Sequence, residues 1–303
     1  MRHAGRPRRR RHNGEVTPAS YQPSPSQAAI PLGLVLALAV QNAVPPFATD
    51  MYSPAFPQVA RDLSTSAGSV GLTLTVFFIG MALGQVAGGA VSDQRGRRLP
   101  MVVGGLVCAC GAVVCALAPN IGVLMAGRLL QGLGGGAAAV VGRAVLVDLA
   151  HGSQLASVMS VLMALGALAP MIAPVAGGAV LSVGTWRMVF WFLVGFGLFM
   201  TMMAFFFVPE SLPPERRQSG GLRRLARGVG ELVTHRAYLG YMLTSAFSGF
   251  AMFAYISSSS FVLQEINGLS PMTFSVFFAC TAGSQMLLSV LNARLVRHAS
   301  PRR

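Results

Sequence analysis

The sequence contains no lysine and few acidic residues: 23 of its 303 residues are arginine and nine are aspartate or glutamate. Charged residues make up 11% of the chain, whereas a soluble domain usually has about 25%. Hydrophobic residues make up 53%, and the mean hydropathy is +0.60. This shortage of charge excludes an ordinary soluble domain and predicts an integral membrane protein. We interpret the absence of lysine as the compositional bias of a GC-rich genome and not as a sign of function.

The sequence also lacks the motifs of the common enzyme classes. It has no serine elbow, no phosphate-binding loop and no metal-ligand spacing, and its glycine triplet at 134–136 lies in an apolar run and not after a strand. The four cysteines all fall in apolar runs: Cys108, Cys110, Cys115 and Cys280. We interpret them as buried small hydrophobic residues. The sequence therefore predicts no enzyme, no cofactor and no metal site.

What the sequence has in abundance is long apolar runs. A membrane-spanning helix needs about 20 mostly apolar residues. Eight runs of this kind are predicted as spans, at about 28–57, 68–92, 100–118, 121–149, 155–183, 187–208, 237–263 and 272–296. The first is interrupted by Pro45 and Pro46. The fold class that we predict is an all-α membrane protein.

The runs and the polar stretches between them predict four regions. Residues 1–27 are rich in arginine, proline and serine and are expected to be a disordered basic tail, unless the start codon is misassigned. A bundle of six helices is predicted over 28–209, a basic linker over 210–236 and two further spans over 237–303.

The arginines are concentrated in alternate gaps between the runs. The gaps on the other side hold only Arg61 and Arg187. Because positive residues favour the cytoplasmic side, this pattern predicts a multi-pass protein of the bacterial inner membrane with its N-terminus in the cytoplasm. The arginines do not line one soluble face, so the partner that we expect is the lipid bilayer and not nucleic acid.

The short loop at 89–100 carries one acid and three arginines between two apolar runs, which predicts a tight hairpin at the membrane surface. The loop resembles the signature between helices 2 and 3 of the major facilitator superfamily, G-x-L-x-D-R-x-G-R-R. The matching residues are Gly89, Asp93, Gly96, Arg97 and Arg98. Gln94 stands where that family usually has arginine.

The resemblance implies that this loop is a cytoplasmic gate formed by Asp93, Arg97 and Arg98. Asp148, at the end of the fourth run, is the expected partner of Arg97. In the superfamily the loop aspartate meets a helix of the second half, which would lie beyond the eight spans predicted here. The alternative is a solvated loop whose surface pairs each contribute less than about 1 kcal/mol.

Asp50 lies inside the first predicted span, where a carboxylate is costly and indicates function by default. The alternative is that Asp50 caps the outer end of the span. The segment at 49–57 resembles the first-helix motif of drug:proton antiporters of the bicyclomycin-resistance type. That resemblance implies proton and substrate binding at Asp50, with Tyr52 beside it. Asn42 stands where some relatives have a second acid.

Arg128 is a second charge within a span. At 1.5 Å per residue it lies about 10 Å from the outer end of the fourth run, and Asp50 has a similar depth. We therefore expect the two to form a buried ion pair. The alternative is that the Arg128 side chain extends to the outer surface. The run resembles the family's R-x-x-Q-G motif, which implies that Arg128 and Gln131 face a central cavity.

The fifth run contains two prolines four residues apart among small residues, which predicts a kinked helix that packs closely. It resembles the fifth-helix antiporter motif of the superfamily. The matching residues are Gly166, Pro170, Pro174, Gly177 and Gly178, with Ala173 in place of a glycine. Without the resemblance, a kinked packing helix is the plain alternative. Gly80, Gly84 and Gly88 also recur at four-residue spacing in the second run, which predicts close helix packing.

The resemblance extends over about residues 30–295. It implies a complete six-helix N-terminal half with about two helices of a C-terminal half. It implies a monomeric exporter that works by alternating access. Protons would compete at Asp50 with a small amphipathic, drug-like substrate. Two alternatives stay open: an uptake symporter on the same fold, and a non-transporting remnant, since the family has two halves of six helices each.

Overall fold

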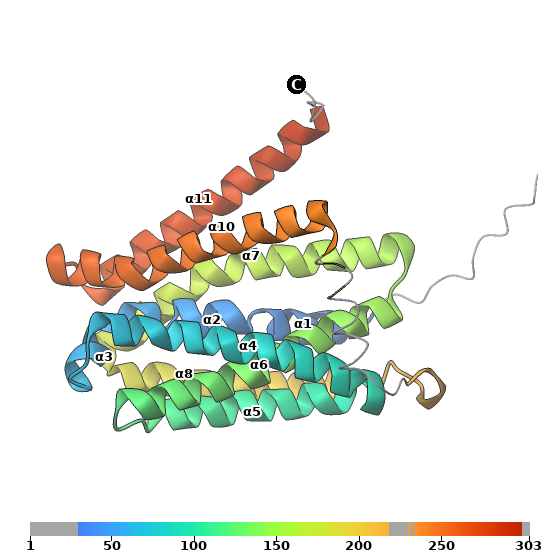
Figure 1. Cartoon of the computed structure of the whole chain (residues 1–303), viewed down its shortest axis with the longest axis horizontal. Coiled ribbons are helices and arrows are strands. Elements are labelled where there is room, and N and C mark those ends of the chain that lie inside the picture. The colour runs from blue at the N-terminus through green and yellow to red at the C-terminus, as the bar shows by residue number, and fades with distance from the viewer. Residues whose placement is uncertain (1–29, 218–229, 231, 233, 299–303) are drawn as a thin grey trace, which may run out of the picture. The chain divides into compact units, whose positions relative to one another are not determined.

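The computed structural model describes residues 30–217, 230, 232 and 234–298 (Figure 1). Every regular element among these residues is helical. Eight helical segments are long and apolar enough to cross a membrane: Leu32–Asp62, Ala67–Arg95, Arg98–Ala116, Ile121–Leu149, Gly152–Val183, Trp186–Phe207, Arg236–Ile266 and Pro271–Asn292. The eight predicted spans are confirmed. The predicted tail over 1–27 and the part of the predicted linker at 218–229 lie outside the described residues.

The first span is broken into short helices. They are α1 (Leu32–Asn42), α2 (Val44–Asp50), the 3-10 turn η1 (Ser53–Ala55) and α3 (Phe56–Asp62). Each break precedes a proline at the first or second position of the next helix. Proline is tolerated there because the amide that it lacks would have no helical partner. The prolines of this span therefore decide where it bends.

The other spans are nearly continuous helices: α4 (Ala67–Arg95), α5 (Arg98–Ala116), α6 (Ile121–Leu149), α7 (Gly152–Val183), α8 (Trp186–Phe207), α10 (Arg236–Phe261) and α11 (Pro271–His298). A short π-helix, η3 (Val262–Ile266), follows α10, and a 3-10 turn, η2 (Pro214–Arg216), follows α8. Ser66 and Asn120 cap the starts of α4 and α6 by accepting backbone N–H groups. Gly96 ends α4 with φ +96°.

Glycines bring α6 into close contact with the helices on both sides of it (Figure 1). On α4, a Cβ at Gly80 or Gly84 would strike a backbone carbonyl of α6. On α5, a Cβ at Gly104 would lie 2.8 Å from the carbonyl oxygen of Gly134. The close packing predicted from the four-residue glycine spacing is confirmed for α4, and α6 packs between α4 and α5.

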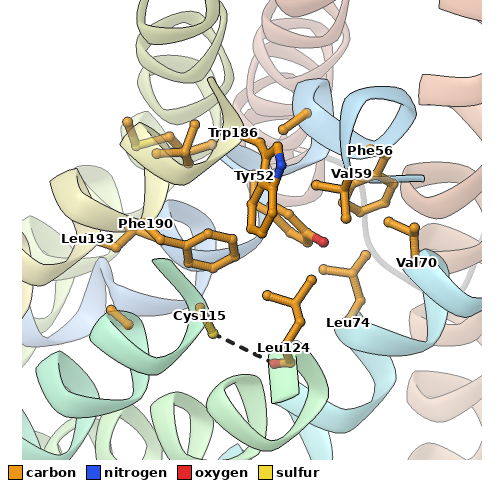
Figure 2. Packing of buried hydrophobic residues seen from close by; sticks show 14 of the residues in the cluster. Tyr52, Phe56, Val59, Val70, Leu74, Cys115, Leu124, Trp186, Phe190 and Leu193 are labelled. Carbon is orange, nitrogen blue, oxygen red and sulfur yellow. Dashed lines mark hydrogen bonds between the residues drawn. The ribbon is translucent and has the colours of Figure 1, made fainter. Parts of the chain in front are cut away.

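An aromatic core closes one end of the bundle, which we call the Trp186 end (Figure 2). Trp186 is fully buried and belongs to the same cluster as Tyr52, Phe56 and Phe190. The indole Nε1 of Trp186 donates to Asp62 Oδ2 at 2.9 Å, which fastens the start of α8 to the end of α3. The loop after α4 lies at the opposite ends of these helices, and we call that the Arg97 end.

The last two spans pack on the first and fifth. Ser260 Oγ of α10 donates to the carbonyl of Ser53 at 2.7 Å, and Gln264 Nε2 donates to the carbonyl of Pro54 at 3.1 Å. On α7, a Cβ at Gly178 would lie 2.9 Å from Cβ of Ser275 on α11. The Trp186 end of the first span is thus held by both α10 and α11.

Large apolar side chains are exposed on the surfaces of the spans, as a bilayer requires. Leu83, Phe206 and Leu287 are all more than half exposed. Two of the four cysteines are also exposed. Cys108 and Cys115 are buried as predicted, but the prediction of burial is wrong for Cys110 and Cys280. An apolar run places a residue in a membrane helix but does not say which face of that helix is covered by protein.

Candidate functional site

A cavity of about 450 Å³ lies among α2, α7, α10 and α11. Its lining is mostly apolar and aromatic: Asn42, Pro45, Pro46, Thr49, Asp50, Phe78, Met163, Gly166, Pro170, Met252, Phe253, Tyr255, Ile256, Phe278, Thr281, Ala282 and Gln285. Asp50 is the one charged residue in this set. A cavity with this lining can hold a partly apolar molecule and offers it a single carboxylate.

Asp50 is the last residue of α2, and its position follows from the break in the first span. Its side chain is buried, and Oδ1 accepts a hydrogen bond of 2.9 Å from Thr49 Oγ1. Within the part of the chain that the structure describes, the Asp50 carboxylate forms no ion pair. Asn42, the last residue of α1, lines the same cavity. Two of the predicted binding residues therefore share one cavity.

Arg128 is fully buried inside the bundle and does not line the cavity. Its Nη1 donates to the carbonyl of Ala48 at 2.8 Å and to Gln131 Oε1 at 2.7 Å. The guanidinium carbon lies 4.3 Å from the centre of the Phe77 ring and 5.1 Å from that of Tyr52, which is cation–π geometry. The predicted ion pair with Asp50 is thus absent from the described structure, and the alternative of an Arg128 that reaches the surface is wrong.

Tyr52 does not line the cavity either. Its ring lies in the aromatic core that Figure 2 shows, and its centre is 5.0 Å from that of the Phe190 ring. The Tyr52 hydroxyl accepts a hydrogen bond of 3.4 Å from Thr73 Oγ1. The predicted site residues therefore form two groups. Asp50 and Asn42 line the cavity, while Tyr52, Arg128 and Gln131 pack behind it.

The small residues and prolines of α7 contribute to the cavity and to its packing. Gly166 and Pro170 line the cavity. Pro174 is buried, and a Cβ at Gly177 would strike the backbone carbonyl of Met51. A Cβ at Gly178 would press on α11. The first part of the motif thus borders the cavity, and the second part brings α7 close to the first span and to α11.

At the Arg97 end, Arg97 joins the loop after α4 to the end of α6. Its Nε donates to Asp148 Oδ2 at 2.9 Å, and its Nη1 donates to Asp93 Oδ1 at 2.6 Å. The prediction that Asp148 is the partner of Arg97 is confirmed. Partial burial would lower the pKa of the Arg97 guanidinium, but the two carboxylates raise it above its usual range. Arg97 therefore stays protonated and positively charged.

Sequence reasoning missed Glu210, which follows α8. Its carboxylate accepts the backbone N–H groups of Arg97 at 2.8 Å and Arg98 at 3.3 Å, and also that of Leu212 at 3.0 Å. Burial alone would raise the pKa of Glu210, but these donors hold it below its usual range. A Cβ at Gly96 would strike this carboxylate. The signal for Glu210 was weak: one acid at the end of the sixth run, just before an arginine-rich stretch.

Arg98 takes a different direction from Arg97. Its Nη2 donates to the carbonyl of Phe205 at 2.5 Å, and its guanidinium lies 4.9 Å from the centre of the Phe205 ring. Arg98 was predicted to form part of the cytoplasmic gate with Asp93 and Arg97. The described structure instead places its side chain on α8, so that two neighbouring arginines fasten the loop to two different helices.

Residues of the last two spans also line the cavity. Tyr255 of α10 and Phe278 and Gln285 of α11 do so. The rings of Tyr255 and Phe278 are stacked, with centres 6.1 Å apart. No pattern in the sequence identified Phe278 and Gln285, because α11 is apolar on most of its surface and its hydropathy pattern does not indicate a direction.

Comparison with known sequences supports a family assignment. The sequence model of the Major Facilitator Superfamily matches residues 38–303. An uncharacterized MFS-type transporter, YdgK, of Bacillus subtilis (strain 168) is 39% identical over 249 residues, which are 82% of this chain and 62% of that protein. A bicyclomycin resistance protein homolog of Haemophilus influenzae is 35% identical over 262 residues, which are 86% of this chain and 66% of that protein.

A multidrug resistance protein, MdtL, of Escherichia coli is 29% identical over 244 residues, which are 80% of this chain and 61% of that protein. The chain thus spans less than two thirds of the length of these relatives. Among solved structures, a bacterial homolog of the human lysosomal transporter Spinster in an inward-facing, unoccupied conformation superposes with a TM-score of 0.72 at 18% identity. The match covers 90% of this chain and 63% of that one.

A D-xylose-proton symporter has a TM-score of 0.62 at 16% identity, and the match covers 88% of this chain and 69% of that chain. At such low identity these two structures establish the fold alone. They agree with the helical arrangement described above.

Proposed function

The chain belongs to the Major Facilitator Superfamily, and on that premise we propose that it is a proton-coupled exporter of small amphipathic drugs. It is a multi-pass membrane protein and a transporter by fold and family, not an enzyme. The proposed membrane is the bacterial inner membrane, with the N-terminus and the Arg97 end in the cytoplasm, because arginines concentrate on that side. Alternating access is the proposed mode of transport.

One observation carries the proposal: among the described residues that line this mostly apolar and aromatic cavity, Asp50 is the one with a charge. A carboxylate there can be neutralised by a proton or by the positive charge of a bound substrate, but not by both at once. Binding of one therefore releases the other, which is the coupling that an antiporter needs. Aromatic side chains such as Phe253 and Phe278 would hold the apolar part of a cationic drug.

Arg128 is proposed as a positioning residue for Asp50. It holds the carbonyl of Ala48, two residues before Asp50, and it is itself held by Gln131 and by the rings of Tyr52 and Phe77. A shift of α2 against α6 would have to break this bond. Arg128 can thus transmit a change at Asp50 to the rest of the six-helix bundle without contact with the substrate.

The cluster around Arg97 is proposed as a gate at the cytoplasmic end. Its bonds to Asp93 and Asp148 fix the loop after α4 to α6, and Arg98 fixes the loop to α8. On α7, Gly166 and Pro170 border the cavity. Gly177 and Gly178 let α7 pack closely against the first span and against α11. We propose that α7 transmits movement between the cavity and α11.

The names of two relatives support the substrate class. One is a bicyclomycin resistance protein homolog and another is a multidrug resistance protein. Because this chain spans 66% and 61% of those proteins, their activities enter here only as a proposal. The proposed unit is a monomer that handles protons and a drug-like molecule within the bilayer.

The proposal is tested with the full chain in proteoliposomes that carry a pH gradient, with ethidium as the cationic probe. We expect ethidium to move against the proton flow, and Asp50→Asn to abolish that movement. Glu215→Gln is the matched control, because Glu215 is an exposed acid of η2 outside the cavity. Unchanged ethidium transport in Asp50→Asn would remove Asp50 from the mechanism. Proton-driven accumulation of a labelled sugar or amino acid would favour the uptake symporter instead.

A further inference from the structure

A furrow of about 200 Å³ lies between α4 and α5, and α6 forms its floor. It is separate from the cavity that holds Asp50, and no residue lines both. The side chains that matter most for its chemistry are Val91 and Arg95 of α4, Leu99 and Val103 of α5, and Leu133 and Ala137 of α6.

The furrow exists because α4 and α5 each pack on α6 more closely than on each other. Gly88 of α4 lies against Ala137, and Gly104 of α5 lies against Gly134. These two close approaches draw both helices onto α6 and leave a gap between them. The packing that holds the bundle together thus also shapes the furrow.

The walls of the furrow are apolar and open to the surroundings of the protein. Val91 is 41% exposed, Leu99 is 53% exposed and Val103 is 47% exposed. In a chain that crosses a bilayer, such a surface faces lipid acyl chains. The part lined by α5 extends from Leu99 to Val107, which is about 12 Å along the helix.

Arg95 lies at the end of the furrow and is the loop arginine without a protein partner in the part of the chain that the structure describes. Arg97 points inward to Asp148, and Arg98 lies on α8. Arg95 is exposed and lines the furrow. The nearby acids are already bonded, Asp93 to Arg97 and Glu210 to backbone N–H groups. A free cation therefore stands where an apolar furrow meets the membrane surface.

We propose that this furrow binds an anionic phospholipid, with the phosphate at Arg95 and an acyl chain along Val91 and Val103. A guanidinium suits a phosphate because it is planar and always charged. A basic group beside a groove between membrane helices is a recurring feature of lipid headgroup sites. The inference does not depend on the proposed transport activity.

The test uses the purified full chain in detergent, mixed with equal amounts of dioctanoyl phosphatidylglycerol and dioctanoyl phosphatidylethanolamine. Native mass spectrometry counts the lipid that stays bound. We expect Arg95→Gln to weaken retention of phosphatidylglycerol about fivefold and to leave phosphatidylethanolamine unchanged. Arg236→Gln is the matched control, because Arg236 is an exposed arginine at the start of α10, away from the furrow.

A second pair of variants tests the apolar part of the site without a change of charge. Val103→Trp fills the furrow and should reduce the retention of both lipids. Val161→Trp is its control, since Val161 is 45% exposed on α7 and does not line the furrow. The proposal is overturned if Arg95→Gln keeps as much phosphatidylglycerol as the parent chain, or if Arg236→Gln loses as much. It is also overturned if Val103→Trp retains as much of both lipids as the parent chain does. This second test can be made even if Arg95→Gln does not fold.

Discussion

Arg128 donates a buried hydrogen bond of 2.8 Å to the backbone carbonyl of Ala48, so that α6 holds the end of α2. The same Nη1 bonds Gln131, while Nε and Nη2 have no partner in the described structure. A guanidinium in these surroundings is compensated by carbonyl dipoles and aromatic rings instead of by a carboxylate. Asp50, two residues after Ala48, is thereby left free to face the cavity.

Arg128→Met is expected to destabilise the protein by about 2 kcal/mol. Met has a similar length but cannot donate, so Ala48 O and Gln131 Oε1 lose a buried donor. Loss of the cation–π contacts adds to this effect. The measurement is thermal unfolding in detergent, with the exposed Cys110 and Cys280 replaced by serine in parent and variant alike. It is followed through the reaction of the buried thiols of Cys108 and Cys115 with a fluorescent maleimide.

Arg61→Met provides the comparison for this experiment. Arg61 pairs with Glu265 at 3.6 Å, but the side chains are 66% and 46% exposed, and such a pair contributes less than about 1 kcal/mol. Equal unfolding temperatures for Arg128→Met and the parent chain would contradict the role given to Arg128.

Gly84→Ala is expected to destabilise the bundle by about 1–3 kcal/mol, because the new methyl group would strike the carbonyl of Leu133 on α6. Backbone atoms cannot move aside as a flexible side chain can. Gly89→Ala is an ideal control on the same helix, since no atom lies within 4 Å of a Cβ there. It should be neutral or slightly stabilising, because alanine favours a helix. Thermal unfolding of both variants decides the matter, and equal effects would refute the tight α4–α6 contact.

The bond between Arg97 and Asp148 is expected to show a coupling free energy of about 1–3 kcal/mol in a double-mutant cycle of Arg97→Gln and Asp148→Asn. The two side chains are only 11% and 22% exposed, so water screens the pair weakly. The unfolding free energies of both single variants and the double variant give the coupling. The exposed pair of Arg61 and Glu265 should give less than about 0.5 kcal/mol. A coupling for Arg97 and Asp148 no larger than that would mean that the cluster is a loose surface contact.

Glu210→Gln is expected to destabilise the protein by about 1 kcal/mol or less at neutral pH, because the exposed carboxylate is screened by solvent. The folded state favours the charged form, since its donors hold the pKa of Glu210 below the usual range. The contribution is therefore fully present above the ordinary pKa of a glutamate and is lost as the pH falls through the lower, folded-state pKa. Unfolding of the parent chain and of Glu210→Gln is compared at neutral pH and in acid. The difference in unfolding free energy between the parent chain and Glu210→Gln should disappear in acid. A difference that grows in acid would contradict a stabilising, charged Glu210.

The number and approximate limits of the spans could be predicted from the sequence, because bilayer thickness sets the length of an apolar run and proline sets where a helix can break. The pairing of Arg97 with Asp148 was also within reach. Both residues are charged, both end a long apolar run, and alternation of the spans brings those ends to the same side.

What the sequence could not decide is how each helix is rotated about its axis. Asp50 and Arg128 have similar depths, and both are buried, yet the described structure directs one toward the cavity and the other toward Ala48, Tyr52 and Phe77. Phe278 and Gln285 of α11 were missed for the same reason. Glu210 was missed because it lies in the loop after α8, where no helical pattern indicates a partner. Composition and spacing determined that this chain lies in a membrane and where charged residues separate its apolar runs. Only tertiary packing, set by glycine contacts such as Gly84 on Leu133, decided which side chains meet, because that choice depends on the neighbours of a helix and not on its own residues.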